Sequence, residues 1–399
     1  MKKAGVFDFL RLIYTGECTS RTELGQKMEV APSKLCDIVA EALSRGLLVE
    51  CGLAQSKRGR RRVLLGINPE LAQLVGIEIG RWHTRIACTD FVGNTLDYQE
   101  LASETSKGKD RLLQVAHQAI KRLLLRYPRV AAIGISHSGV IDRRAGKVLF
   151  WPTVDGWEDT PLKEIFEAEH KVPLFLEDSV RAAAKVEQRL GHGKGARNFV
   201  FVYVGMGIGS AVFIDGCLYE GHDGLAGELG HLTVKDNGKL CSCGNRGCLE
   251  LYSSAAAIIG QVREEIEHGV ASSLSREVRE NPGHLSLEKI AAAAQSHDRL
   301  AERVLNEAGG YLGTALAGVV NLLNPERIIL SGHAPRAAQE FFLGSLLYNL
   351  RHRSIAQSTP GLDVVVSQFG DEAAALGAVL IAGEEVLKAR CREMGENNV

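Results

Sequence analysis

The chain has 399 residues, of which 45% are hydrophobic and 24% are charged, and its formal net charge is −1. This composition is typical of a globular protein of two or three domains and excludes a disordered chain or a polycation. The sequence contains neither a run of about 18 apolar residues nor the apolar core of a signal peptide, so we expect a cytoplasmic protein without a membrane span.

The first 65 residues differ from the rest in charge. They contain 12 Lys and Arg residues against 7 Asp and Glu residues, whereas the remainder contains 35 against 41. A basic head on an acidic body favours a polyanionic partner for the head alone.

Helical spacing of apolar residues predicts three helices within residues 1–67, and β-rich runs predict two strands at 47–50 and 63–67. A capping box at Ser20–Glu23 would begin the second helix, and Pro32 suits the first turn of the third. Three helices and a two-stranded ribbon make a winged helix-turn-helix domain.

Such a domain binds double-stranded DNA through its third helix and through the tip of its ribbon. The residues expected to face bases and phosphates at the start of the third helix are Pro32, Ser33, Lys34 and Asp37. The ribbon tip carries five cations, which would make binding strongly salt-dependent: Lys57, Arg58, Arg60, Arg61 and Arg62. The alternative is a dimerisation module with a solvated basic loop.

Strands and helices alternate through residues 68–399, which indicates an α/β body with mixed sheets. The pattern occurs twice, so we expect lobes of approximately 68–195 and 196–399. A cleft between two such lobes is a usual place for a small ligand. The sequence has nine cysteines, an odd number that does not predict a disulfide framework. Six of them are expected to be mostly buried free thiols: Cys18, Cys36, Cys51, Cys88, Cys217 and Cys391.

The segment Gly227–Glu250 contains one histidine and three cysteines, namely His231, Cys241, Cys243 and Cys248. Four such ligands in one short run are typical of a structural, tetrahedral zinc ion. Glu228 and Glu250 flank this set, and because carboxylates are not preferred beside thiolates, they are available to another partner.

A second glycine-rich segment, residues 205–209, lies between two predicted strands. It is open to two interpretations, a tight hairpin or a loop that approaches a phosphate.

Several segments together resemble the ROK family of repressors, open reading frames and sugar kinases. They include GELGHLTV followed by CSCGNRGCLE, and also VYVGMGIGSAVFIDG, GISHSGVID and NLLNPERIIL. The head with SKRGRRRVLLGIN is similar to the DNA-binding arm of the family's repressors, such as those that respond to xylose or N-acetylglucosamine. The resemblance covers nearly the whole chain and implies a two-lobed, actin-like and hexokinase-like ATPase fold behind the head.

Position by position, the resemblance implies that the kinase machinery is lost. The family's kinases carry an Asp-x-Gly-Gly-Thr phosphate loop, but this chain has Glu78-Ile-Gly-Arg-Trp82, and Met206 replaces a usual threonine. The position of the catalytic base holds Ser179, which cannot accept a sugar proton at neutral pH. Asp178 beside it is either a base displaced by one residue or the cap of the next helix. ATP is therefore an unlikely ligand.

Sugar recognition is better preserved. Glu228, His231 and Glu250 match family positions that contact sugar hydroxyls, and Asp178 is a fourth candidate. One ring nitrogen of His231 would bind zinc while the other donates to the sugar. The alternative for Glu228 and Glu250 is support of the zinc loop.

The sequence therefore predicts a sugar-responsive transcriptional repressor, a homodimer or homotetramer with a sugar or sugar phosphate as effector. Two alternatives stay open. One is a ROK-type sugar kinase that phosphorylates a hexose and carries a DNA-binding head. The other is a DNA-binding protein whose body serves only for dimerisation.

Overall fold

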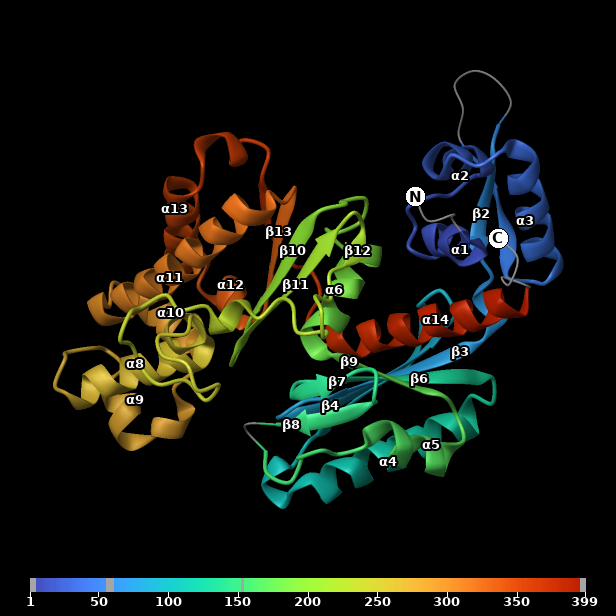
Figure 1. Cartoon of the computed structure of the whole chain (residues 1–399). Helices are drawn as coiled ribbons and strands as arrows, with labels where there is room; N and C mark the ends of the chain where they lie inside the picture. The colour runs from blue at the N-terminus through green and yellow to red at the C-terminus, as the bar shows by residue number, and fades with distance from the viewer. Residues whose placement is uncertain (1–4, 55–60, 152–153, 395–399) are drawn as a thin grey trace. The chain divides into compact units, whose positions relative to one another are not determined.

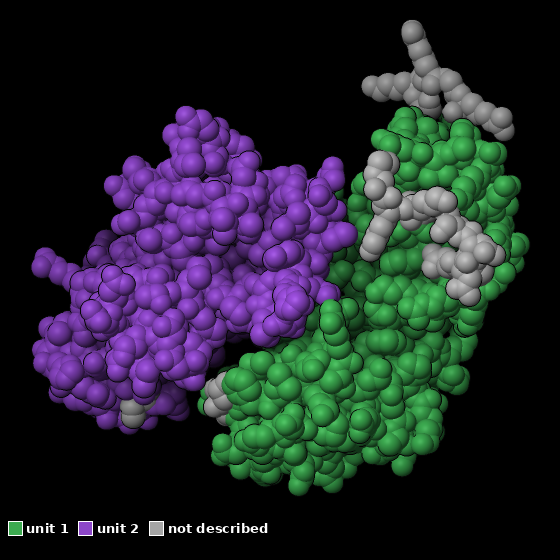
Figure 2. Space-filling view, viewed as in Figure 1, with its two compact units in different colours: residues 1–195, 372–399 green, residues 196–371 purple. Residues whose placement is uncertain are grey.

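The computed structural model describes residues 5–54, 61–151 and 154–394. The chain forms two compact units, each considered by itself (Figures 1 and 2). Unit 1 comprises residues 1–195 and 372–399, and unit 2 comprises residues 196–371. The second lobe predicted as 196–399 is therefore too long, because the C-terminal helix belongs to unit 1.

The head contains the predicted three helices and an antiparallel ribbon, namely α1 (Val6–Tyr14), α2 (Arg21–Met28), α3 (Pro32–Ser44), β1 (Leu48–Leu53) and β2 (Val63–Ile67). The Ser20 hydroxyl accepts a hydrogen bond from the N–H of Glu23, and the Glu23 carboxylate accepts one from the N–H of Thr19. This arrangement satisfies donors at the start of α2 that the helix leaves unpaired. Leu24 and Val39 are fully buried between the helices, which gives the head a small core of its own.

Behind the head, unit 1 contains one five-stranded sheet in the order β5-β4-β3-β6-β9. The first three strands are antiparallel, and β6 and β9 run parallel to β3. The strands of unit 1 are β3 (Gln73–Ile79), β4 (His83–Asp90), β5 (Thr95–Ala102), β6 (Val130–His137), β7 (Val140–Asp142), β8 (Lys147–Phe150) and β9 (Leu174–Asp178). Its helices beyond the head are α4 (Lys109–Arg126), α5 (Leu162–His170), α6 (Ser179–Leu190) and α14 (Ala373–Glu393).

Unit 2 repeats this sheet in the order β12-β11-β10-β13-β14, with three antiparallel strands followed by two parallel ones. The expected duplication of the α/β pattern is thereby confirmed. Its strands are β10 (Phe199–Val204), β11 (Ile208–Ile214), β12 (Cys217–Leu218), β13 (Arg327–Ser331) and β14 (Asp363–Val366). Its helices are α7 (Glu250–Ser253), α8 (Ala255–Glu267), α9 (Ser275–Glu280), α10 (Leu287–Gln295), α11 (Arg299–Leu323), α12 (His333–Ala337) and α13 (Gly344–Arg353).

Helix α14 belongs to unit 1, where it packs both on the sheet and on the head. A Cβ atom at Gly134 of β6 would lie 1.9 Å from the carbonyl oxygen of Ala378, so only glycine permits this approach. On the other side, the Tyr14 hydroxyl donates to the Leu380 carbonyl oxygen at 3.2 Å, and the Arg189 guanidinium lies 3.8 Å from the Tyr14 ring centroid. Burial raises the pKa of Tyr14 to about 12, which keeps the phenol a donor.

The junction between head and body is also tied down. The Asn68 side chain donates to the Gly46 carbonyl oxygen at 2.9 Å, and the N–H of Phe91 donates to the Pro69 carbonyl oxygen. One continuous apolar core runs from Leu10 in the head to Leu74 in β3 and Leu387 in α14. The head is therefore packed into unit 1 and is not suspended on a linker.

Three of the six scattered cysteines do not fit the expectation of buried thiols. Cys18, Cys88 and Cys391 are buried, whereas the others lie on the surface: Cys36, Cys51 and Cys217. Within the described ranges, no helix has the length and apolar character needed to cross a membrane.

Candidate metal centre and sugar-binding residues

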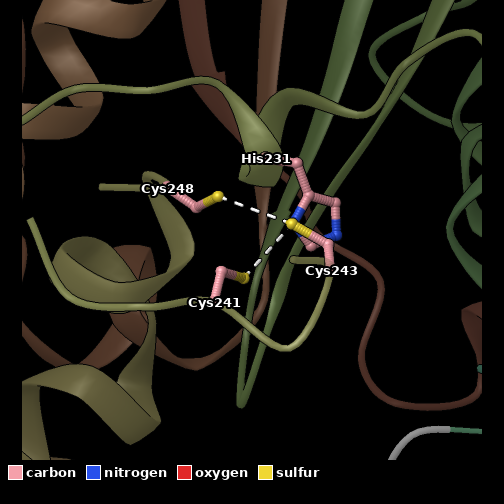
Figure 3. Close-up of side chains that lie close together, drawn as sticks. All are labelled: His231, Cys241, Cys243 and Cys248. Atoms are coloured by element: carbon pink, nitrogen blue, oxygen red, sulfur yellow. Dashed lines mark hydrogen bonds between the residues drawn. The ribbon is translucent and has the colours of Figure 1, made fainter. Parts of the chain in front are cut away.

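The four predicted zinc ligands converge in unit 2 (Figure 3). The sulfur atoms of Cys243 and Cys248 are 3.7 Å apart, and the Cys241 sulfur is 3.7 Å from Nδ1 of His231. Two thiolates that bind one tetrahedral zinc ion at about 2.3 Å lie about 3.8 Å apart. The donor set and its spacing therefore fit a tetrahedral zinc ion.

Backbone hydrogen bonds hold these ligands in place. Thr233 pairs with Cys248 and Leu240 pairs with Arg246 as antiparallel bridges, and the N–H of Cys241 donates to the Asn245 carbonyl oxygen. Cys241 and Cys248 are buried, whereas Cys243 is exposed. The loop thus brings one solvent-facing and two enclosed sulfur atoms to one point.

The thiols differ in acidity as long as no cation is bound. Burial raises the pKa of Cys248 to about 12, and the neighbouring thiols add to this shift. The backbone N–H of Asn245 is the largest cause that lowers the pKa of Cys243. A bound dication would stabilise all three thiolates together, so the chemistry of the cluster, like its spacing, fits a metal ion.

The second ring nitrogen of His231 faces Glu228, with 3.9 Å between Nε2 and the carboxylate oxygen. The Glu228 side chain is 63% exposed, so it can reach a ligand. If Nδ1 binds metal, Nε2 carries the proton and points to the Glu228 side. The preceding residue, Gly227, has φ +98°, and a Cβ atom there would lie 2.4 Å from the Ser210 carbonyl oxygen. This close approach to β11 positions Glu228 beside the metal cluster.

Glu250, which was expected to contact sugar hydroxyls, also has a hydrogen-bond partner within the protein. Its Oε2 atom accepts a hydrogen bond at 2.9 Å from the N–H of Ile208, the first residue of β11. Strands β10 and β11 are antiparallel, with Val204 opposite Ile208, and the Gly205 N–H donates to the Gly207 carbonyl oxygen. The hairpin interpretation of the glycine-rich segment is therefore confirmed. Glu250 supports this hairpin with one carboxylate oxygen.

The loop at Gly80–Trp82, which the resemblance sets against a kinase phosphate loop, is closed by protein hydrogen bonds. The Gly80 N–H donates to the His83 carbonyl oxygen at 3.2 Å, and the Ser103 hydroxyl donates to the Gly80 carbonyl oxygen at 2.6 Å. The Trp82 side chain is 57% exposed, and the Arg81 guanidinium lies 5.0 Å from the centroid of its indole. The backbone N–H and carbonyl groups of Gly80 are therefore both hydrogen-bonded within the protein, so the N–H is not available to a phosphate in this conformation.

Sequence reasoning missed Arg85, which forms an ion pair with Glu78, the acid just before the same loop. Its guanidinium donates to the carboxylates of Glu78 and Glu100, at 3.0 Å in each case. The signal was weak, because Arg85 is the one arginine in β4, whose burial becomes evident only in the structure. The carboxylate of Glu78 is therefore held by a charge-assisted hydrogen bond within the protein.

Asp178 caps helix α6, as one of its two interpretations predicted. Its Oδ1 atom accepts hydrogen bonds from the N–H groups of Val180 and Arg181, at 2.9 and 3.0 Å, and Ser179 is the first residue of the helix. Asp178 lies in unit 1, whereas Glu228, His231 and Glu250 lie in unit 2. A sugar site that includes all four stays a prediction.

In the head, the side chains predicted to face DNA lie on the surface. The exposed residues of this set are Pro32, Ser33, Lys34, Asp37, Arg61 and Arg62. The Arg62 guanidinium is 3.8 Å from the Glu23 carboxylate, a contact between two exposed groups. Lys57, Arg58 and Arg60 lie outside the described residues.

A family model described as the ROK family matches residues 74–385 of the chain. The protein belongs to the ROK family. Within the family, the chain is 30% identical over 380 residues to the xylose repressor of Bacillus subtilis (strain 168), a similarity that covers 94% of each chain.

Among solved structures, the chain is similar to a ROK family transcriptional regulator, a homolog of the E. coli MLC protein. Their TM-score is 0.80 at 29% identity, over 97% of this chain and 98% of the other. It is also similar to the ROK hexokinase of Thermus thermophilus, with a TM-score of 0.68 at 28% identity, over 79% of this chain and 99% of the hexokinase. These similarities confirm the fold that the resemblance implied.

Proposed function

We propose that this ROK protein is a sugar-responsive transcriptional repressor, which acts in the cytoplasm as a homodimer or homotetramer. The observation that carries the proposal is the extent of the similarity. The ROK transcriptional regulator covers 97% of this chain, whereas the hexokinase covers 79%, and the family model begins only at residue 74. The head is therefore a feature shared with a regulator.

The head would bind operator DNA through α3 and the ribbon. Leu35 and Val39 of α3 face the core of the head, whereas Lys34 and Asp37 are exposed, so one face of the helix is available to the major groove. Arg61 and Arg62 extend this surface toward the ribbon tip. In a dimer, two heads would contact two half-sites of a roughly palindromic operator.

The body would bind the sugar through Glu228, His231 and Glu250, with Asp178 as a candidate from unit 1. Exposed Glu228 can accept hydrogen bonds from sugar hydroxyls, while one oxygen of Glu250 is bonded to Ile208. Zinc, when bound, would supply a fixed anchor for His231, Cys241, Cys243 and Cys248 and would take no part in chemistry. The sugar can shift the equilibrium between DNA-binding states only by its differential affinity for them.

A sugar kinase with a DNA-binding head is the second candidate, because a hexokinase shares the fold of the body. Against it stand Ser179 in place of a general base, the capping role of Asp178, and the pairing of Arg85 with Glu78. Sugar-dependent release of ADP in a coupled assay would favour the kinase over the regulator.

The test uses the full chain with zinc. Duplexes that it binds are selected from a random pool, and operator affinity is then titrated with a panel of pentoses, hexoses, amino sugars and their phosphates. The proposal expects one sugar class to weaken operator binding. If no duplex is selected, the head is not a DNA-binding domain. If a duplex is selected but calorimetry detects no sugar binding, the body serves only for dimerisation.

A further inference from the structure

A second cluster of metal-binding side chains lies in unit 1. His117 belongs to α4, and Glu169 and His170 end α5. Nδ1 of His117 is 2.9 Å from Nε2 of His170 and 3.2 Å from a carboxylate oxygen of Glu169. The three donor atoms all lie within 4.8 Å of one another.

We propose that His117, Glu169 and His170 form a second metal site, which binds a divalent transition-metal ion such as Zn²⁺ and leaves one position to water. Ligands of a tetrahedral zinc ion at about 2.0–2.1 Å lie about 3.3 Å apart. The two shortest separations in the cluster are close to that value, so small side-chain rotations would admit the ion. Two imidazoles and one carboxylate with an open position form a recurring zinc ligand set.

The surroundings hold His117 in the required orientation. Its ring stacks on Phe166 with 4.1 Å between centroids and 18° between planes, and Phe166 is fully buried. The His117 side chain is only 14% exposed.

The open side of the cluster faces solvent. A surface hollow of about 270 Å³ is lined by Lys121, Leu124, Leu125, Glu169 and His170. This space can hold the water that completes the coordination of the ion. The Lys121 ammonium opposes a cation and the Glu169 carboxylate attracts one, so we expect weaker binding than at the cluster of three cysteines. The ion would tie the C-terminus of α5 to the middle of α4.

The experiment measures zinc bound per full-length chain by equilibrium dialysis and elemental analysis. We expect two ions for the wild type and one each for His117→Gln and His170→Gln. Lys121→Gln, which lines the same hollow but removes no ligand, is the matched control and should keep both ions. Cys243→Ser should lose the ion of unit 2 and keep this one.

Cobalt distinguishes the two sites independently of stoichiometry. In unit 2, Co²⁺ would give a thiolate-to-metal charge-transfer band, and in the proposed site it would not. A single ion per wild-type chain at saturating zinc would overturn the proposal, as would a second ion that persists in the double variant H117Q/H170Q. In both cases the His117–His170 contact is only a hydrogen bond. Because His170 is at the end of a helix, H170Q keeps the test valid if H117Q does not fold.

Discussion

The contact between Tyr14 and α14 offers a quantitative test of how the head is joined to the body. Tyr14→Phe removes only the hydroxyl that donates to Leu380, a buried hydrogen bond expected to contribute about 1 kcal/mol. Tyr14→Ala also empties a buried aromatic site, which costs about 3–5 kcal/mol, and it removes the contact with Arg189, which adds about 1 kcal/mol. We therefore expect a graded loss of stability in unit 1.

Tryptophan fluorescence during urea unfolding measures this loss selectively, because Trp82, Trp151 and Trp157 all belong to unit 1. With a slope of about 3 kcal/mol per molar urea, Tyr14→Phe should lower the midpoint by about 0.3 M and Tyr14→Ala by more than about 1 M. Tyr98→Phe removes a hydroxyl from a 40% exposed side chain and should leave the midpoint unchanged. A wild-type midpoint for Tyr14→Ala would refute the packing of the head on α14.

Three further predictions concern zinc, DNA and sugar. Cys243→Ser should lower the zinc content by one ion per chain, as measured by elemental analysis. With zinc at about 1,000 times its dissociation constant, the variant should also lower the free energy of unfolding of unit 2 by about 4 kcal/mol, as measured by calorimetry. The sugar response should be lost before DNA binding. Lys34→Ala should weaken operator binding and reduce the slope of log affinity against log salt by about 1, as measured by fluorescence anisotropy, whereas Arg144→Ala on the exposed β7–β8 turn should change neither. Glu228→Gln should weaken sugar binding about 10- to 100-fold in calorimetry, because a hydrogen bond to a charged group contributes about 1.5–3 kcal/mol, and operator affinity without sugar should stay at the wild-type value.

Elements with strong local signals were predictable from sequence. Helix α6 at Ser179–Leu190 begins after the capping residue Asp178, and strand β10 at Phe199–Val204 is a continuous apolar run, so both carry their signals in the local sequence. The metal cluster was equally accessible, since its four ligands lie within one loop. The start of strand β9 at Leu174 has a weaker local signal, because the preceding Lys171 has φ 56° and its N–H ends α5 by donating to the Glu167 carbonyl oxygen.

What could not be predicted depends on contacts between distant parts of the chain. The return of α14 to unit 1 rests on its packing against Gly134 and Tyr14, more than 200 residues earlier. Likewise, the hydrogen bond of Glu250 to Ile208 and the proximity of His117 to His170 involve residues far apart in sequence. Apolar periodicity shows that a segment is buried, but it does not identify the partner.

The central claim is that a sugar bound to the body controls DNA binding by the head. Its most direct test is the operator affinity of the full-length, zinc-loaded protein with and without each sugar, measured in parallel for Glu228→Gln. We predict that one sugar class weakens operator binding by the wild type and that the variant needs about 10- to 100-fold more of it. Operator affinity that no sugar or sugar phosphate changes would contradict the account.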